Sequence, residues 1–284
     1  MPPPEGGSAA GSEQPSVPPP GRSLAQAVVT ALVLLGVIVV CTLGGRRWFF
    51  VLAAVAVLMA AFELLDALVQ KDGRPSILLG LAGTLGMLVA SYQERFAFVG
   101  IVLAVTAYAA FLFALRPSRG DRAASDVAWT VLALVWIGGG GAGAVSILVM
   151  PGGLPLLVAS ILIVACDDIG AYFAGTSFGR HKIAPSISPA KSWEGFAGGI
   201  VTALAAGLLF ASLLREMTVP TGLALGAIAG LLAPVGDLVE SLAKREIGIK
   251  DSGRLLPGHG GMLDRLDAII FCCPALSLYL HFVA

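Results

Sequence analysis

Nine predominantly apolar stretches follow one another along this chain, and all but the short third one are long enough to cross a bilayer as a helix. A helix satisfies its own backbone hydrogen bonds, as hydrocarbon requires. Of the residues, 57% are hydrophobic and only 13% are charged, whereas soluble domains carry about 25% charged residues. The pattern predicts an all-α, polytopic transmembrane bundle of about nine spanning helices. The stretches are about 23–43, 48–69, 75–91, 96–115, 126–149, 153–176, 195–214, 219–243 and 265–284.

Composition divides the chain into a polar N-terminal tail and two apolar regions. Residues 1–22 are rich in Pro, Gly and Ser and offer too little apolar surface to fold, so we expect a disordered tail. Residues 23–150 are expected to form N-terminal transmembrane helices. Residues 151–284 carry most of the polar chemistry and are expected to form a C-terminal transmembrane catalytic region.

Lys and Arg concentrate in alternate connecting segments, above all in 177–194 and 244–264. Basic residues in short loops favour the cytoplasmic side of a membrane. We therefore expect a multi-pass protein of the cell membrane, with a cytoplasmic N-terminus and a site that faces the cytoplasm.

One apolar stretch carries small residues at a fixed interval. Gly222, Gly226 and Gly230 repeat every four residues, which places them on one face of a helix. Stripes of this kind allow helices to approach closely in membranes. We expect a tight helix contact here rather than a ligand site.

The cytoplasmic end of the stretch 219–243 carries a polar stripe. Asp237, Glu240, Ser241 and Lys244 are spaced i, i+3, i+4 and i+7, so they share one helix face. Charges within spanning helices cost free energy and usually serve a function. Two carboxylates, a hydroxyl and an ammonium group therefore line the helix where it leaves the membrane.

The loop that follows adds an anion-binding pattern. Lys250 and a glycine-rich turn around His259 precede Asp264 and Asp267, which lie at the start of the last helix. Exposed backbone N–H groups and a helix N-terminus suit phosphate. Mg²⁺ binds one or two carboxylates together with substrate phosphates. We expect a functional role for Asp237, Asp264 and Asp267.

A second polar group lies in the segment 177–194 and the helix before it. Asp168 lies near the end of that helix, and Ser188, Lys191 and Ser192 are the kinds of donors and acceptors that hold a polyphosphate. Basic residues at helix ends also follow the positive-inside bias alone. Glu63 and Asp66, in the second stretch, either complete the site or stabilise the bundle, and the sequence does not decide between these roles.

These residues resemble the signature of the phosphatidate cytidylyltransferases, also called CDP-diacylglycerol synthases. The upstream block Ile187–Gly195 is similar to a second pattern of that family, although Ala190 and Ser192 depart from its usual residues, and the doubled Asp167–Asp168 leaves open which carboxylate matters. The signature runs through Ser241-Leu-Ala-Lys244-Arg245, Lys250-Asp251, Pro257-Gly258-His259-Gly260-Gly261 and Asp264-Arg265-Leu-Asp267.

The resemblance implies that CTP and phosphatidate react to give CDP-diacylglycerol and pyrophosphate. It also implies an all-helical membrane fold and a homodimer. The implied cofactor is Mg²⁺, and whether K⁺ is a second ion is left open. No nucleic-acid partner is expected. Metal ligands are expected at Asp237 and Asp264, with Asp267 beside them. The catalytic candidates are Asp237, Asp264, Lys244 and Lys250, and the substrate-binding candidates are Ser188, Lys191, Ser192, Ser241, Arg245, His259 and Asp168.

Three other classes of function remain open from the residues alone: another lipid-modifying enzyme, a transporter and a structural scaffold. A related cytidylyltransferase could use another lipid, such as an isoprenoid ether phosphate, and a polyprenol-type lipid kinase would need similar groups. A transporter could use the acidic residues to bind a cation, although no internal repeat of the kind found in many transporters is visible. A structural scaffold would leave the charged loops unexplained.

Overall fold

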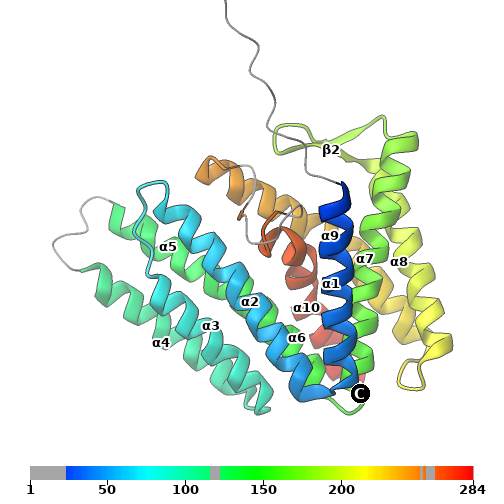
Figure 1. Ribbon diagram of the computed structural model, residues 1–284, viewed down its shortest axis with the longest axis horizontal. Helices are drawn as coiled ribbons and strands as arrows, with labels where there is room; N and C mark the ends of the chain where they lie inside the picture. Colours follow the sequence, from blue (N-terminus) through cyan, green and yellow to red (C-terminus); the bar gives the residue numbers. More distant parts are fainter. Residues whose placement is uncertain (1–23, 116–121, 250–251, 254–259, 284) are drawn as a thin grey trace, which may run out of the picture.

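The computed structural model describes residues 24–115, 122–249, 252–253 and 260–283. The predicted tail, 1–22, lies outside these residues. Within them the chain is almost entirely helical, with one small hairpin (Figure 1). The elements are α1 (Leu24–Leu43), α2 (Arg46–Val69), α3 (Ile77–Tyr92), α4 (Phe96–Ala114), α5 (Ala123–Ala133), the π-helical turn η2 (Leu134–Gly138), α6 (Gly139–Val149), α7 (Gly153–Phe178), β1 (Lys182–Ala184), β2 (Ser188–Ser192), α8 (Trp193–Leu213), α9 (Val219–Ile247) and α10 (Leu263–Val283).

The helices are those of a multi-pass membrane protein. Within the described residues, seven helices are long and apolar enough to cross a membrane, and one of them runs without a break through α5, η2 and α6. The segments Leu32–Leu43 and Ile77–Tyr92 are apolar but shorter. The predicted all-α polytopic fold is therefore confirmed, and the count of about nine spans stays a prediction.

Close backbone contacts hold α8 against α9. A Cβ atom added at Gly207 would lie 2.1 Å from the Gly222 carbonyl oxygen, and one at Gly226 would lie 2.7 Å from the Ala203 carbonyl oxygen. Gly230 packs in the same way on Ile200. The glycine stripe of α9 is thus a helix-packing surface, as predicted.

The arrangement gathers the polar ends of several helices at one end of the bundle. Helices α7, α8, α9 and α10 pack together, and α3, α4 and α5 lie on the other side of α2 and α6 (Figure 1). The hairpin, the C-terminal end of α9 and the N-terminal end of α10 lie at the same end, and the C-terminus of the chain lies at the opposite end (Figure 1). The segments with the predicted site residues are therefore neighbours in space.

The segment between α7 and α8 folds as an antiparallel β-hairpin, β1–β2. The Glu194 carboxylate closes its base, because it accepts hydrogen bonds from the backbone N–H groups of Arg180 and His181 and contacts the His181 ring at 2.7 Å. Pro185 and Pro189 oppose helix formation in this segment, but the sequence did not predict strands.

Candidate active site

A cavity of about 610 Å³ opens between the hairpin and the ends of α7, α8 and α9. We call it the hairpin pocket. Asp167, Asp168, Tyr172 and Thr176 of α7 form one wall. The other walls come from Lys182 and Ile183 of β1, Ala190, Lys191 and Ser192 of β2, Gly195 and Phe196 of α8, and Pro234 and Asp237 of α9.

An ion pair connects the two sides of the hairpin pocket. Lys191 of β2 donates to the Asp237 carboxylate of α9 at 2.5 Å and to the Pro234 carbonyl oxygen at 3.1 Å. Both charged side chains keep some exposure, 20% for Lys191 and 29% for Asp237. The structure thus brings together two predicted residues that are far apart in the sequence, and both remain accessible to a ligand in the pocket.

Asp237 is also the centre of a group of carboxylates. Asp167 and Asp168 of α7 and Asp267 of α10 each interact electrostatically with it. Asp167 is fully buried, and neither of its carboxylate oxygens has a hydrogen-bond partner among the described residues. Several acidic groups so close together repel one another, so this region attracts cations.

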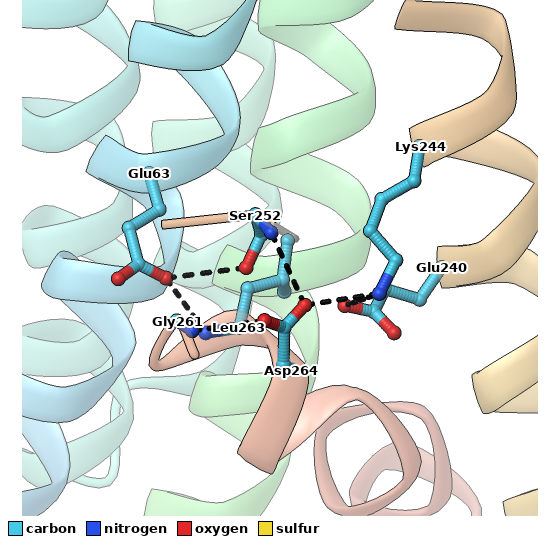
Figure 2. A network of polar contacts seen from close by, with 7 residues as sticks. All are labelled: Glu63, Glu240, Lys244, Ser252, Gly261, Leu263 and Asp264. Atoms are coloured by element: carbon cyan, nitrogen blue, oxygen red, sulfur yellow. Dashed lines mark hydrogen bonds and ion pairs between the residues drawn. The ribbon is translucent and has the colours of Figure 1, made fainter. Parts of the chain in front are cut away.

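A second cluster lies where α9 meets α10 (Figure 2). The Lys244 ammonium lies 3.0 Å from Glu240 on its own helix and 3.0 Å from Asp264 of α10. The Glu240 carboxyl interacts with both Asp264 and Asp267. Since Asp267 also interacts with Asp237, a continuous row of acidic groups joins this α9–α10 cluster to the hairpin pocket.

Backbone hydrogen bonds fix the orientation of Asp264. One carboxylate oxygen accepts from the N–H of Gly261 at 2.8 Å, and the other accepts from the N–H of Ser252 at 3.3 Å as well as from Lys244. Asp264 lies in the first turn of α10, where a negative charge interacts favourably with the helix dipole. Asp264 is therefore held by three donors before any ligand is considered.

The other predicted substrate-binding residues have different surroundings. Ser192 caps α8 by accepting from the N–H of Gly195 at 3.2 Å, and it also lines the pocket. Ser188 is half-buried in β2 and is not among the residues that line the pocket. Arg245 donates to the Ile187 carbonyl oxygen, so it ties the hairpin to α9. Ser241 is half-buried on α9, and Lys250 and His259 lie outside the described residues.

The structure separates the two acidic residues of α2. Glu63 is buried and accepts from the N–H of Leu263 at 2.9 Å and from the Ser252 hydroxyl at 3.5 Å (Figure 2). Asp66 instead accepts from Gln70, four residues along its own helix, at 2.6 Å. Only Glu63 therefore belongs to the polar network around Asp264.

Some residues of this site were missed or left undecided by the sequence-based prediction. Glu240 was recognised on the polar stripe but was not assigned a role, and Asp167 was left as an alternative to Asp168. The available signal for both was the cost of a charge within a membrane helix. No sequence pattern indicated that the Ser252 N–H donates to Asp264.

The described residues contain no group of three or more His, Cys, Asp or Glu side chains arranged to hold a metal ion. Asp237 and Asp264 are each paired with a different lysine. The donor chemistry nonetheless fits Mg²⁺, because this ion needs only one or two protein carboxylates and takes its remaining ligands from phosphates and water. The metal ligands thus stay a prediction.

Comparison with known proteins places this site in a family. The model of the cytidylyltransferase family matches residues 25–283, which include every described helix of the site. The chain belongs to the cytidylyltransferase family. Within this family the chain resembles proteins that carry the name phosphatidate cytidylyltransferase. One from Mycobacterium bovis is 43% identical over 154 residues, which cover 54% of this chain and 50% of the relative.

Two further relatives show the range of the match. A phosphatidate cytidylyltransferase of Haemophilus influenzae is 42% identical over 136 residues, 46% of this chain and 47% of the relative. An uncharacterised protein of Escherichia coli is 40% identical over 131 residues, 46% of this chain and 44% of the relative. The match spans about half the length of the curated relatives.

Proposed function

We propose that this cytidylyltransferase-family protein transfers CMP from CTP to phosphatidate and releases pyrophosphate. The names of the relatives from Mycobacterium bovis and Haemophilus influenzae support this reaction. The observation that carries the proposal is the hairpin pocket, in which Lys191 and Asp237 face each other beside a row of carboxylates that leads to Lys244. Such a site offers cationic groups for phosphate and acidic groups for a divalent cation.

In the proposed reaction, a phosphate oxygen of phosphatidate attacks the α-phosphorus of CTP. A new P–O bond joins the two phosphates, the bond from the α-phosphorus to the bridging oxygen breaks, and pyrophosphate leaves with that electron pair. The nucleophile is already an anion, so positioning and charge stabilisation supply most of the catalysis. Lys191 and Lys244 are suitably placed to neutralise phosphate oxygens, and no covalent enzyme intermediate is needed.

Mg²⁺ is the cofactor that we propose for this reaction, and the identity of a second ion such as K⁺ stays open. Asp237 and Asp264, with Asp267 between them along the row of acidic groups, would hold it. A bound divalent ion would supply charge neutralisation on the phosphates. The oxygens of Asp167, which accept no hydrogen bond from the part of the chain that the structure describes, would also attract a cation to this region.

The location of the site at one end of the bundle supports a defined orientation. Basic residues lie in the hairpin segment and in the last turn of α9, within the described part of the chain. Such residues favour the cytoplasmic side of a membrane. We therefore propose that the protein lies in the cell membrane with this site facing the cytoplasm. CTP would arrive from solution and the lipid from the bilayer. A homodimer is also proposed, as the family resemblance implies.

A panel of lipids offered to the purified protein in detergent tests the substrate. The protein is mixed with CTP, Mg²⁺ and one lipid at a time: phosphatidate, an isoprenoid ether phosphate or a polyprenol. We expect CDP-diacylglycerol and pyrophosphate with phosphatidate, and no product when EDTA removes divalent ions. Reaction of another lipid without reaction of phosphatidate would contradict the proposed substrate, and release of CDP with a newly phosphorylated lipid would indicate a kinase.

A further inference from the structure

The carboxylate of Glu63 lies in an unusual place for an acidic residue. It belongs to α2, an apolar helix long enough to cross a membrane, and Glu63 is 4% exposed. A buried charge of this kind costs free energy unless polar groups compensate it. Its partners come from the other end of the sequence, since it accepts from the N–H of Leu263 and from the Ser252 hydroxyl.

Two glycines make room for this carboxylate. A Cβ atom at Gly253 would lie 2.5 Å from Glu63 Oε1, and one at Gly261 would lie 2.6 Å from Glu63 Oε2. A side chain at either position would therefore collide with the carboxylate. Gly253 and Gly261 thus allow the backbone to pack directly against the Glu63 carboxylate.

The groups that contact Glu63 are also the groups that orient Asp264. Ser252 contacts Glu63 through its hydroxyl and Asp264 through its N–H. Gly261 packs on Glu63 and donates its N–H to Asp264. Figure 2 shows Glu63 on one side of this segment and Asp264, with Lys244 and Glu240, on the other.

We propose that Glu63 is a positioning residue, whose carboxylate reaches across from α2 to fix the start of α10 and so orients Asp264 and Lys244 for CMP transfer. The inference rests on the proposed function, because Asp264 and Lys244 are its proposed catalytic groups. Glu63 is not among the residues lining the hairpin pocket. Its loss should therefore lower the rate of the chemical step more than the affinity for CTP.

Two variants of Glu63 test this role, because one shortens the side chain and keeps its charge, and the other keeps the length and removes the charge. Glu63→Asp keeps the charge but is one methylene shorter, so it cannot reach the Leu263 N–H from the same backbone position. Glu63→Gln keeps the reach and an acceptor oxygen but loses the charge. Asp66→Asn is the matched control, because it removes an acidic group from the same helix, and the Asp66 carboxylate accepts from Gln70 and not from the described segment around Asp264.

We expect Glu63→Asp to lower kcat about tenfold, equivalent to about 1.4 kcal/mol, with the KM for CTP changed less than about twofold. The kcat of Glu63→Gln should stay within about threefold of the wild-type value, and the kcat of Asp66→Asn should equal the wild-type value. Hydrogen exchange of the backbone amides at 260–264 should accelerate in Glu63→Asp and stay unchanged in Asp66→Asn.

Three results would overturn the proposal. In the first, Glu63→Asp keeps its full kcat. In the second, it loses kcat, CTP affinity and thermal stability together or does not fold, which indicates a general scaffold role. In the third, Glu63→Gln is as impaired as Glu63→Asp, which makes charge rather than reach decisive. The exchange measurement needs no substrate, so it tests the positioning role even if the wild-type protein does not act on phosphatidate.

Discussion

At the scale of single residues, Asp237 connects the hairpin electrostatically to the neighbouring helices. It pairs with Lys191 of the hairpin and interacts with acidic residues of α7 and α10. The sequence predicted Asp237 as a site residue because a charge in a membrane helix is a strong signal, and Lys191 because cationic groups in this segment suit a polyphosphate; both roles stay predictions. It could not pair them, since no local spacing relates residues in different elements.

Removing the charge of Asp237 should disable the site without unfolding the protein. Asp237→Asn keeps the shape of the side chain but weakens the contact with Lys191 and lowers the negative charge of the acidic row. We expect kcat/KM for CDP-diacylglycerol formation to fall about 100-fold, or about 2.7 kcal/mol. Steady-state kinetics with varied CTP measure this effect.

Asp72→Asn provides a control of the same chemistry. Asp72 is exposed in a loop with a positive φ of 64°, a backbone conformation that Asn also tolerates. This variant should keep wild-type kinetics. Equal activity of Asp237→Asn and Asp72→Asn would remove Asp237 from the catalytic groups.

At the scale of elements, the periodic apolar pattern predicted the helices better than the connecting segment of the site. The expected start of the last helix at 265 and its observed start at Leu263 differ by two residues, and Asp264 lies in the first turn. The β-hairpin was not predicted, because its pairing depends on contacts such as those of Glu194 and Arg245 with distant backbone groups. Tertiary contacts of this kind leave no periodic signal in a sequence.

The close packing of α8 on α9 predicts a stability effect. Gly207→Ala would place a Cβ atom 2.1 Å from the Gly222 carbonyl oxygen, so the helices must separate. Overpacking of this kind costs about 1–3 kcal/mol. We expect a lower thermal unfolding temperature in detergent for this variant.

Gly100→Ala in α4 is the matched control, because nothing lies within 4 Å of the added Cβ atom. Alanine favours a helix over glycine by about 1 kcal/mol, so this variant should be as stable as wild type or more so. A Gly207→Ala protein as stable as Gly100→Ala would show that α8 and α9 do not depend on close backbone contact.

At the scale of the whole molecule, the N-terminal and C-terminal regions share their cores. One core cluster joins Phe49, Ile147 and Leu148 to helices α7–α10, and another joins α2 to Ala243 and Ile270. The sequence predicted a catalytic region in residues 151–284, and that assignment stays a prediction. Glu63 could not be assigned from the sequence, because its role depends on a contact with residues 200 positions away.

We propose that the carboxylates and lysines around the hairpin pocket and the α9–α10 cluster transfer CMP, rather than phosphate, to a lipid. The most direct test follows a radiolabel at the α-phosphorus of CTP, and in parallel one at the γ-phosphorus, during reaction of the purified protein with phosphatidate and Mg²⁺. We expect the α-label to enter the lipid and the γ-label to leave in pyrophosphate. Appearance of the γ-label in the lipid, or of neither label, would contradict CMP transfer.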